Sequence, residues 1–149
     1  MVECDFPECT TFGSVIRFAL ELEKGAAGVY DELSKEPKAA SAAEVFRTLS
    51  SVHKKRGELL EFTRREKLNE MILEPISELK REDYLIDTKT PIGLDAKAAA
   101  RFASKIEETS ARFYADSARI AKNLMAEAAR TMEKLGKENM ANKAKLEAL

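Results

Sequence analysis

Polar side chains interrupt otherwise apolar stripes in the middle of four long helical patterns. Apolar residues that recur at alternating spacings of three and four mark the buried face of a helix. Six polar residues stand on these stripes: Glu23, His53, Arg56, Glu107, Asn139 and Asn142. Ionised groups that are buried alone cost several kcal/mol each, so these side chains need one another as partners. The pattern predicts a polar site at one level of a helical core.

Two interpretations of this set are open. Carboxylates and imidazole are ligands for Fe, Mn or Zn, so Glu23, His53 and Glu107 are candidates for holding one such ion. In the other interpretation no metal is bound, and Arg56 forks toward Glu23 or Glu107 to balance their charge. One divalent ion beside Arg56 would leave an excess of positive charge in a low-dielectric core. We therefore expect no cofactor, with one Fe, Mn or Zn ion as the alternative.

The elements that position these residues are predicted to be helices. The chain of 149 residues has only 4 Pro and 6 Gly, and no segment shows the period-two alternation of a strand. Helices are expected at about residues 14–33, 41–69, 96–121 and from 123 or 125 to near the C-terminus. Asp95 is predicted to cap the third helix, and Ser41 with Glu44 the second.

The connections between these helices predict how they pair. Two connections are short, whereas residues 70–95 form a long crossover that has room for a short turn of helix between Leu73 and Leu85. The expected fold class is therefore all-α, a four-helix bundle of two helical hairpins joined by the crossover. The hairpins span about residues 14–69 and 96–147, within one domain of residues 14–149 that follows an N-terminal tail, residues 1–13.

The two predicted hairpins share an internal repeat. Four features recur 84 positions later: Arg17-Phe18-Ala19 as Arg101-Phe102-Ala103, Glu23 as Glu107, Ala27 as Ala111, and Tyr30 as Tyr114. This constant offset favours an ancestral duplication. It also places Tyr30 and Tyr114 on the same helix faces as the two glutamates, where their buried hydroxyls need polar partners. Contacts from Tyr30 to Glu107 and from Tyr114 to Glu23 would make both tyrosines part of the polar site.

On these residues the chain resembles the ferritin-like superfamily, and within it the rubrerythrin-type domains. In that family the first and third helices carry a Glu followed seven residues later by a Tyr, as Glu23 with Tyr30 and Glu107 with Tyr114 do here. The second and fourth helices of the family carry Glu-x-x-His four residues after a Leu. Together these side chains bind two irons. The resemblance implies a ferritin-like fold and a homodimer.

This chain departs from the family at both Glu-x-x-His motifs. His53 and Arg56 stand where the second helix of the family has Glu and His, and Asn139 and Asn142 stand there on the fourth helix. The resemblance therefore implies a degenerate di-iron site. We expect a ferritin-like protein that is not an enzyme, has no catalytic residues, and acts by binding a protein partner or by assembling. The alternative is a metal-binding redox or iron-handling protein, an oxidoreductase with a mononuclear or atypical centre.

Composition limits the other partners of the chain. The 25 Lys and Arg nearly balance the 26 Asp and Glu, which argues against nucleic acid as a partner. No apolar run approaches the roughly 18 residues that span a bilayer, and the N-terminus does not resemble a signal peptide, so we expect a soluble, cytoplasmic protein without a membrane partner. Cys4 and Cys9 lack the Cys-x-x-Cys spacing. They are expected to be inert thiols or, alternatively, redox-active ones.

Overall fold

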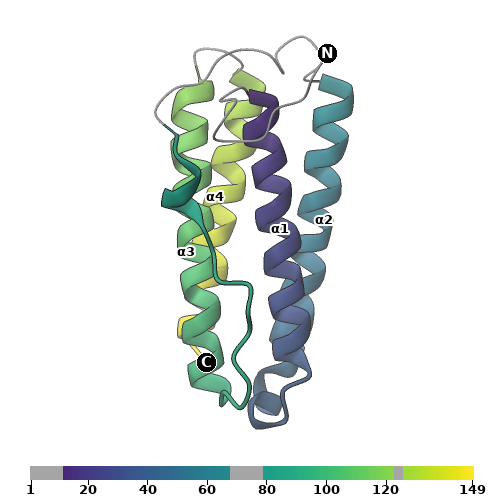
Figure 1. Cartoon of the computed structure of the whole chain (residues 1–149), viewed down its shortest axis with the longest axis vertical. Helices are drawn as coiled ribbons and strands as arrows, with labels where there is room; N and C mark the ends of the chain where they lie inside the picture. The colour runs from purple at the N-terminus through teal and green to yellow at the C-terminus, as the bar shows by residue number, and fades with distance from the viewer. Residues whose placement is uncertain (1–11, 68–78, 123–125) are drawn as a thin grey trace.

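Four long helices lie side by side in the protein (Figure 1). The computed structural model describes residues 12–67, 79–122 and 126–149. Within these ranges the chain forms helices and no strand, which confirms the all-α class. The helices are α1 (Phe12–Ser34), α2 (Ala43–Lys67), α3 (Ala96–Ala121) and α4 (Ala126–Glu147), with short 3-10 helices η1 (Pro37–Ala42) and η2 (Arg81–Tyr84).

The helix starts confirm one predicted cap and correct the other. The Asp95 side chain accepts a hydrogen bond from the backbone N–H of Ala98 at 2.8 Å, as expected for the N-cap of α3. Ser41 does not cap α2, because it lies inside η1, and the side chain of Glu44 pairs with Arg47. Glu36 is the residue that caps this region, by accepting a hydrogen bond from the N–H of Lys38.

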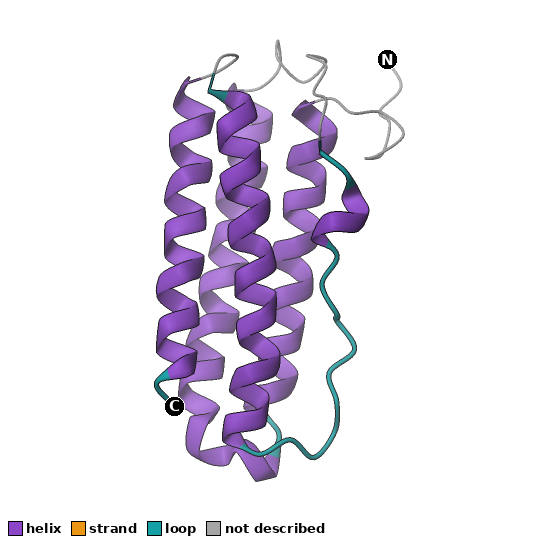
Figure 2. Ribbon diagram, turned by 90° about the vertical axis from the view of Figure 1, so that its left-hand side faces the viewer, coloured by secondary structure: helices purple, strands orange, loops and turns teal. Residues whose placement is uncertain are grey.

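The helices form two antiparallel hairpins that lie against each other. Helix α1 packs along α2, with η1 as the turn between them, and α3 packs along α4. Helices α1 and α4 run in one direction and α2 and α3 in the other (Figure 1). Residues 79–95 return along the outside of the bundle to the start of α3 (Figure 2). The part of the expected crossover at residues 70–78 lies outside the described residues, as do Cys4 and Cys9.

The described part of the crossover is fastened to α1 and α3. Arg81 in η2 binds Glu21 at 2.7 Å, and the Tyr84 hydroxyl donates to Asp116 at 2.5 Å. Farther along, the side chain of Thr88 lies against α1 at Gly25. The short helical turn expected between Leu73 and Leu85 is present as η2, and it serves as the anchor of the crossover.

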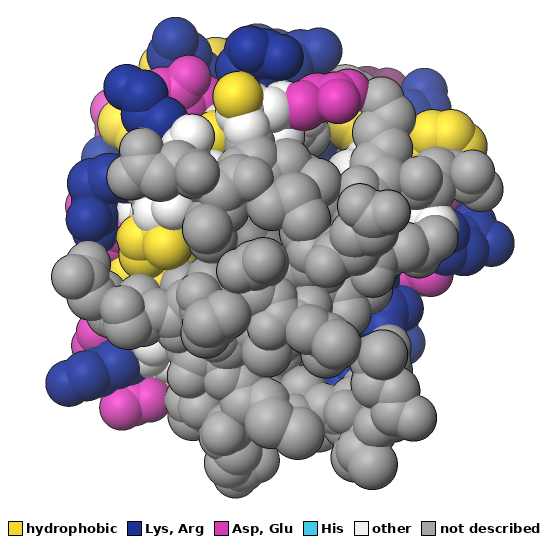
Figure 3. Space-filling model, turned by 90° about the horizontal axis from the view of Figure 1, so that it is seen from above, with side chains coloured by type: hydrophobic (Ala, Val, Ile, Leu, Met, Phe, Trp, Pro, Cys, Tyr) yellow, Lys and Arg dark blue, Asp and Glu magenta, His cyan; other side chains and the backbone are white. Residues whose placement is uncertain are grey.

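Two apolar clusters fill the interior of the bundle. One lies toward the N-terminal end of α1 and includes Phe18, Phe113 and Met132. The other lies toward the opposite end and includes Leu33 and Phe46. On the outside, Lys and Arg side chains alternate with Asp and Glu around the rim of the bundle, as the view onto one end shows (Figure 3). The buried polar residues predicted above lie at the level where the two clusters meet.

Two glycines of α1 offer a matched test of the crossover contact. A Cβ added at Gly28 would meet nothing within 4 Å, whereas one added at Gly25 would lie 2.8 Å from Cγ2 of Thr88. Gly28→Ala should therefore raise the free energy of unfolding by about 1 kcal/mol through helix propensity. Gly25→Ala should gain clearly less, because the crossover has to shift. Urea unfolding of both variants measures the difference, and equal gains would contradict the packing of Thr88 on α1.

Candidate functional site

The polar residues predicted from the helical stripes converge in the centre of the bundle. All six, together with both tyrosines, are buried, with exposed fractions between 0% and 6%. Helix α1 supplies Glu23 and Tyr30 and helix α3 supplies Glu107 and Tyr114; α2 supplies the two cationic side chains, and α4 supplies the two asparagines. The predicted assembly of these residues into one site is thereby present in the structure.

His53 bridges the two carboxylates. Its Nδ1 lies 2.6 Å from Oε1 of Glu23, and its Nε2 lies 2.7 Å from Oε2 of Glu107. A ring with carboxylates at both nitrogens donates from both, which is the protonated imidazolium form. Burial lowers the pKa of His53, but hydrogen bonds and charge from Glu107 and Glu23 outweigh it and raise the pKa from 6.5 to about 9. The ring therefore carries a positive charge at neutral pH.

The tyrosines bind the carboxylates crosswise, which makes both of them part of the polar site. The Tyr30 hydroxyl donates to Oε2 of Glu107 at 2.7 Å, and the Tyr114 hydroxyl donates to Oε2 of Glu23 at 2.5 Å. Burial and the adjacent carboxylate raise the pKa of each tyrosine well above its usual value. The result is a continuous hydrogen-bonded chain from one tyrosine to the other, with His53 at its centre.

Glu107 is the most heavily bonded member of the site. Its Oε2 accepts from Tyr30 and His53, while its Oε1 accepts from the side-chain amides of Asn139 at 2.8 Å and Asn142 at 3.1 Å. Burial raises the pKa of Glu107, but these donors, His53 above all, outweigh burial and hold the pKa below its usual value. Glu107 is therefore an ionised carboxylate whose two oxygens both have several donors.

Arg56 contacts only one of the two carboxylates. Its Nε lies 3.4 Å from Oε1 of Glu23, and its Nη2 donates to Oδ1 of Asn139 at 2.8 Å and to the carbonyl of Leu135 at 3.3 Å. The predicted pairing of Arg56 with Glu23 is therefore present, but without the two parallel hydrogen bonds of a fork, and Asn139 stands between Arg56 and Glu107. Within the described residues, Nε and Nη1 of Arg56 have no hydrogen-bond partner, so the guanidinium acts on Glu23 mainly through its charge.

The charges of the site balance without any further ion. Two carboxylates face an imidazolium and a guanidinium, and the asparagines and tyrosines are neutral donors. Burying such a set is tolerable only if each charge has a partner and the remaining lone pairs are occupied. Both conditions hold for the two carboxylates.

The arrangement does not fit a di-iron centre of the kind that rubrerythrin-type domains bind. Both ring nitrogens of His53 are engaged by carboxylates, so neither offers a lone pair to a metal. Among the described residues, no group of three or more His, Cys, Asp and Glu side chains is placed to hold a metal ion. A single ion at Glu23, His53 and Glu107 would require His53 to lose its proton and to turn away from a carboxylate.

Some polar groups near the site were not predicted from the sequence. Ser50 is buried beside it and donates to the carbonyl of Ala27 at 2.9 Å, which fastens α2 to α1. The carbonyl of Leu135, which accepts a hydrogen bond from Arg56, could not be singled out from the sequence either, because every residue of a helix has a backbone carbonyl. The position of Ser50, three residues before His53 and on the same helix face, is the one clue that could have been used.

Comparison with known proteins gives no relative for this chain. It matches no family model, no curated protein and no solved structure. Among the described residues, no helix combines the length and the apolar character needed to cross a bilayer.

The protonation of His53 can be observed directly, because it is the only histidine in the chain. Nitrogen NMR should show both ring nitrogens protonated at pH 7, and the ring should titrate at about pH 9. The free energy of unfolding should change over the same pH range, because the pKa of His53 is higher in the folded protein than in the unfolded chain. The contribution of His53 is complete below about pH 6.5 and is lost as the pH rises through about 9. A neutral ring at pH 7, or an equal decline of stability in His53→Gln, would contradict this assignment.

Removal of the guanidinium tests the charge balance. Arg56→Leu should lower the free energy of unfolding by about 3–5 kcal/mol, because Glu23 then loses a buried counter-charge. The matched control is Arg47→Leu, an exposed position on the same helix, where the change should stay within about 0.5 kcal/mol. Chemical unfolding of both variants gives the comparison. An unchanged free energy of unfolding in Arg56→Leu would show that the guanidinium does not balance the carboxylates.

Proposed function

We propose that this chain is a ferritin-like, rubrerythrin-related four-helix bundle whose di-iron ligands are largely replaced. The observation that carries the proposal is the double bridge from His53 to Glu23 and Glu107. In a working di-iron centre, the positive charge between the carboxylates of α1 and α3 would come from metal ions. Here the cation is part of the chain.

Three further observations support this relationship. The direction of the helices, with a long crossover between two antiparallel hairpins, is that of ferritin-like proteins. The crosswise contacts of Tyr30 and Tyr114 relate the two hairpins in the way that a duplicated ancestor would. The replaced residues, finally, lie against the glutamates that match the family motif. Loss of the metal would have left these two glutamates without partners.

The proposed role is non-catalytic. A carboxylate saturated by neutral and cationic donors has little remaining affinity for a metal. No other cluster of the described residues forms a metal site. The protein would then act through its surface, by binding a protein partner or by assembling as a homodimer. The buried ion pairs hold the four helices in register for that purpose.

The alternative is a mononuclear or atypical metal centre at Glu23, His53 and Glu107. It is favoured by one observation, which is that these three side chains already touch one another. It is disfavoured by Arg56, whose guanidinium lies 3.4 Å from Glu23 and would repel a divalent ion. Activity as an oxidoreductase would depend on this centre.

Metal analysis separates the two proposals. Protein purified without chelator from iron-supplemented cells should contain well below one equivalent of Fe, Mn or Zn, show no iron absorption bands, and not turn over peroxide. One stoichiometric metal that is lost in Glu23→Ala would overturn the metal-free proposal in favour of the mononuclear centre.

Restoring the family residues tests the ferritin-like proposal itself. The quadruple variant His53→Glu, Arg56→His, Asn139→Glu and Asn142→His should gain about two equivalents of iron, because it completes Glu-x-x-His on both helices. The control is Arg47→His, which completes the same motif with Glu44 on the exposed face of α2 and should gain none. A folded quadruple variant that binds no iron would contradict the proposed ancestry.

A further inference from the structure

An open groove runs along the outer face of the α3–α4 hairpin. It has a volume of about 750 Å³, within the roughly 300–1,000 Å³ typical of ligand sites. Its floor is made of small residues from both helices: Ala111, Ala115, Ala118, Ala126, Ala129 and Gly136. Because these side chains have no polar atoms and the helical backbone beneath them is internally bonded, the floor offers no hydrogen bonds to an occupant.

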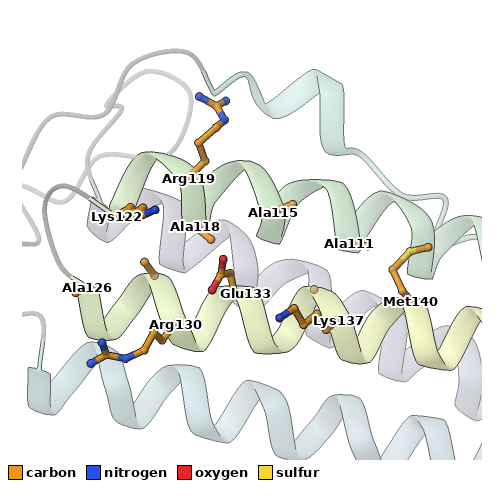
Figure 4. Close-up of a pocket in the computed structure, with 12 residues that line it drawn as sticks. Ala111, Ala115, Ala118, Arg119, Lys122, Ala126, Arg130, Glu133, Lys137 and Met140 are labelled. Carbon is orange, nitrogen blue, oxygen red and sulfur yellow. The ribbon is translucent and has the colours of Figure 1, made fainter.

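The rim of the groove carries an excess of positive charge. Four of the lining residues are basic, namely Arg119, Lys122, Arg130 and Lys137, and Glu133 is the only acidic one. Figure 4 shows Arg119 and Arg130 extending from opposite edges. This excess is local, because the whole chain has a net charge of -1.

Three of the four basic lining residues lie toward one end of the groove, and Lys137 lies toward the other. Lys122 and Arg130 lie at the end where α3 finishes and α4 begins, and Met140 lies at the other end, 49% exposed (Figure 4). The distance from Ala126 to Met140 along α4 is about 21 Å, at 1.5 Å per residue. The groove is therefore more strongly cationic at the end where α3 meets α4, and its long apolar floor ends at Met140, with Lys137 one helical turn before it.

We propose that this groove binds a single long-chain anionic amphiphile, a fatty carboxylate. The carboxylate would pair with Lys122 and Arg130, and the hydrocarbon chain would lie on the alanine floor toward Met140. A hydrocarbon chain requires no hydrogen bonds, which matches what the floor provides. An extended peptide would instead bring backbone N–H and C=O groups that the floor leaves unsatisfied. The site is separate from the buried polar residues and does not depend on the proposed ancestry.

Fluorescence titration with cis-parinarate, kept below its micelle concentration, tests the site on the full chain. Saturable binding of one molecule per chain is expected, and the methyl ester of the probe should bind roughly tenfold more weakly because it lacks the charge. The double variant Lys122→Gln with Arg130→Gln should lose about the same factor. Glu133→Gln should tighten binding, because it removes the one repelling carboxylate; weaker binding in this variant would overturn the charge assignment.

Two further variants test where the chain lies. Ala115 is an exposed helical residue of the floor, so Ala115→Leu should leave the fold intact and abolish saturable binding by filling the groove. Its control is Ala144→Leu, which adds the same volume at an exposed position of α4. Lys54→Gln on α2 is the control for charge, and both controls should bind as the unaltered chain does. Absence of saturable binding, or binding that survives Ala115→Leu, would overturn the proposal.

Discussion

The interaction on which this structure depends is the pair of hydrogen bonds made by His53. One ring from α2 joins Glu23 on α1 to Glu107 on α3, at 2.6 and 2.7 Å. Without a cation between them, two carboxylates at the centre of the bundle would repel each other and one would take up a proton. With the cation in place, each carboxylate stays ionised and holds a tyrosine of the other hairpin. A single protonated ring thus connects three of the four helices, and α4 joins through its asparagines.

The buried polar site fixes how the helices align rather than adding much to the stability of the fold. A buried ion cluster is often no more stabilising than apolar packing of the same volume, although removal of one member is costly. The apolar clusters on both sides of the site supply the driving force for folding. Apolar contacts alone permit a helix to slide, whereas a shift of α1 by one turn would carry Glu23 about 5.4 Å away from His53. The ion pairs therefore select one alignment among several that the apolar residues allow.

Much of the fold and the membership of the site could be predicted from the sequence, because helical periodicity determines which residues share a face. Glu23 and Tyr30 are seven residues apart and must point the same way, and the repeat gives Glu107 and Tyr114 the same relation. Which glutamate each tyrosine contacts was left open by the sequence. The partner of Arg56 could not be predicted in this way. Whether a long side chain reaches a carboxylate or an asparagine depends on the local distance between helices, which periodicity does not give. The anchoring of the crossover at Tyr84 and Asp116 was missed for the same reason.

The side chains of α2 and α4 divide the charge of the site unequally between the two hairpins. The first hairpin contributes one carboxylate and two cations, so its part of the core has a net positive charge. The second contributes Glu107 with two neutral asparagines, so its part has a net negative charge. In a symmetric metal site both hairpins would be negative and the metals would have to join them. Here the hairpins attract each other directly, and pairing of two first hairpins or two second hairpins would bury like charges at close range. The asymmetry between α2 and α4 thus does what the metals of a symmetric centre would do, and it also specifies that the two different halves of one chain pair with each other.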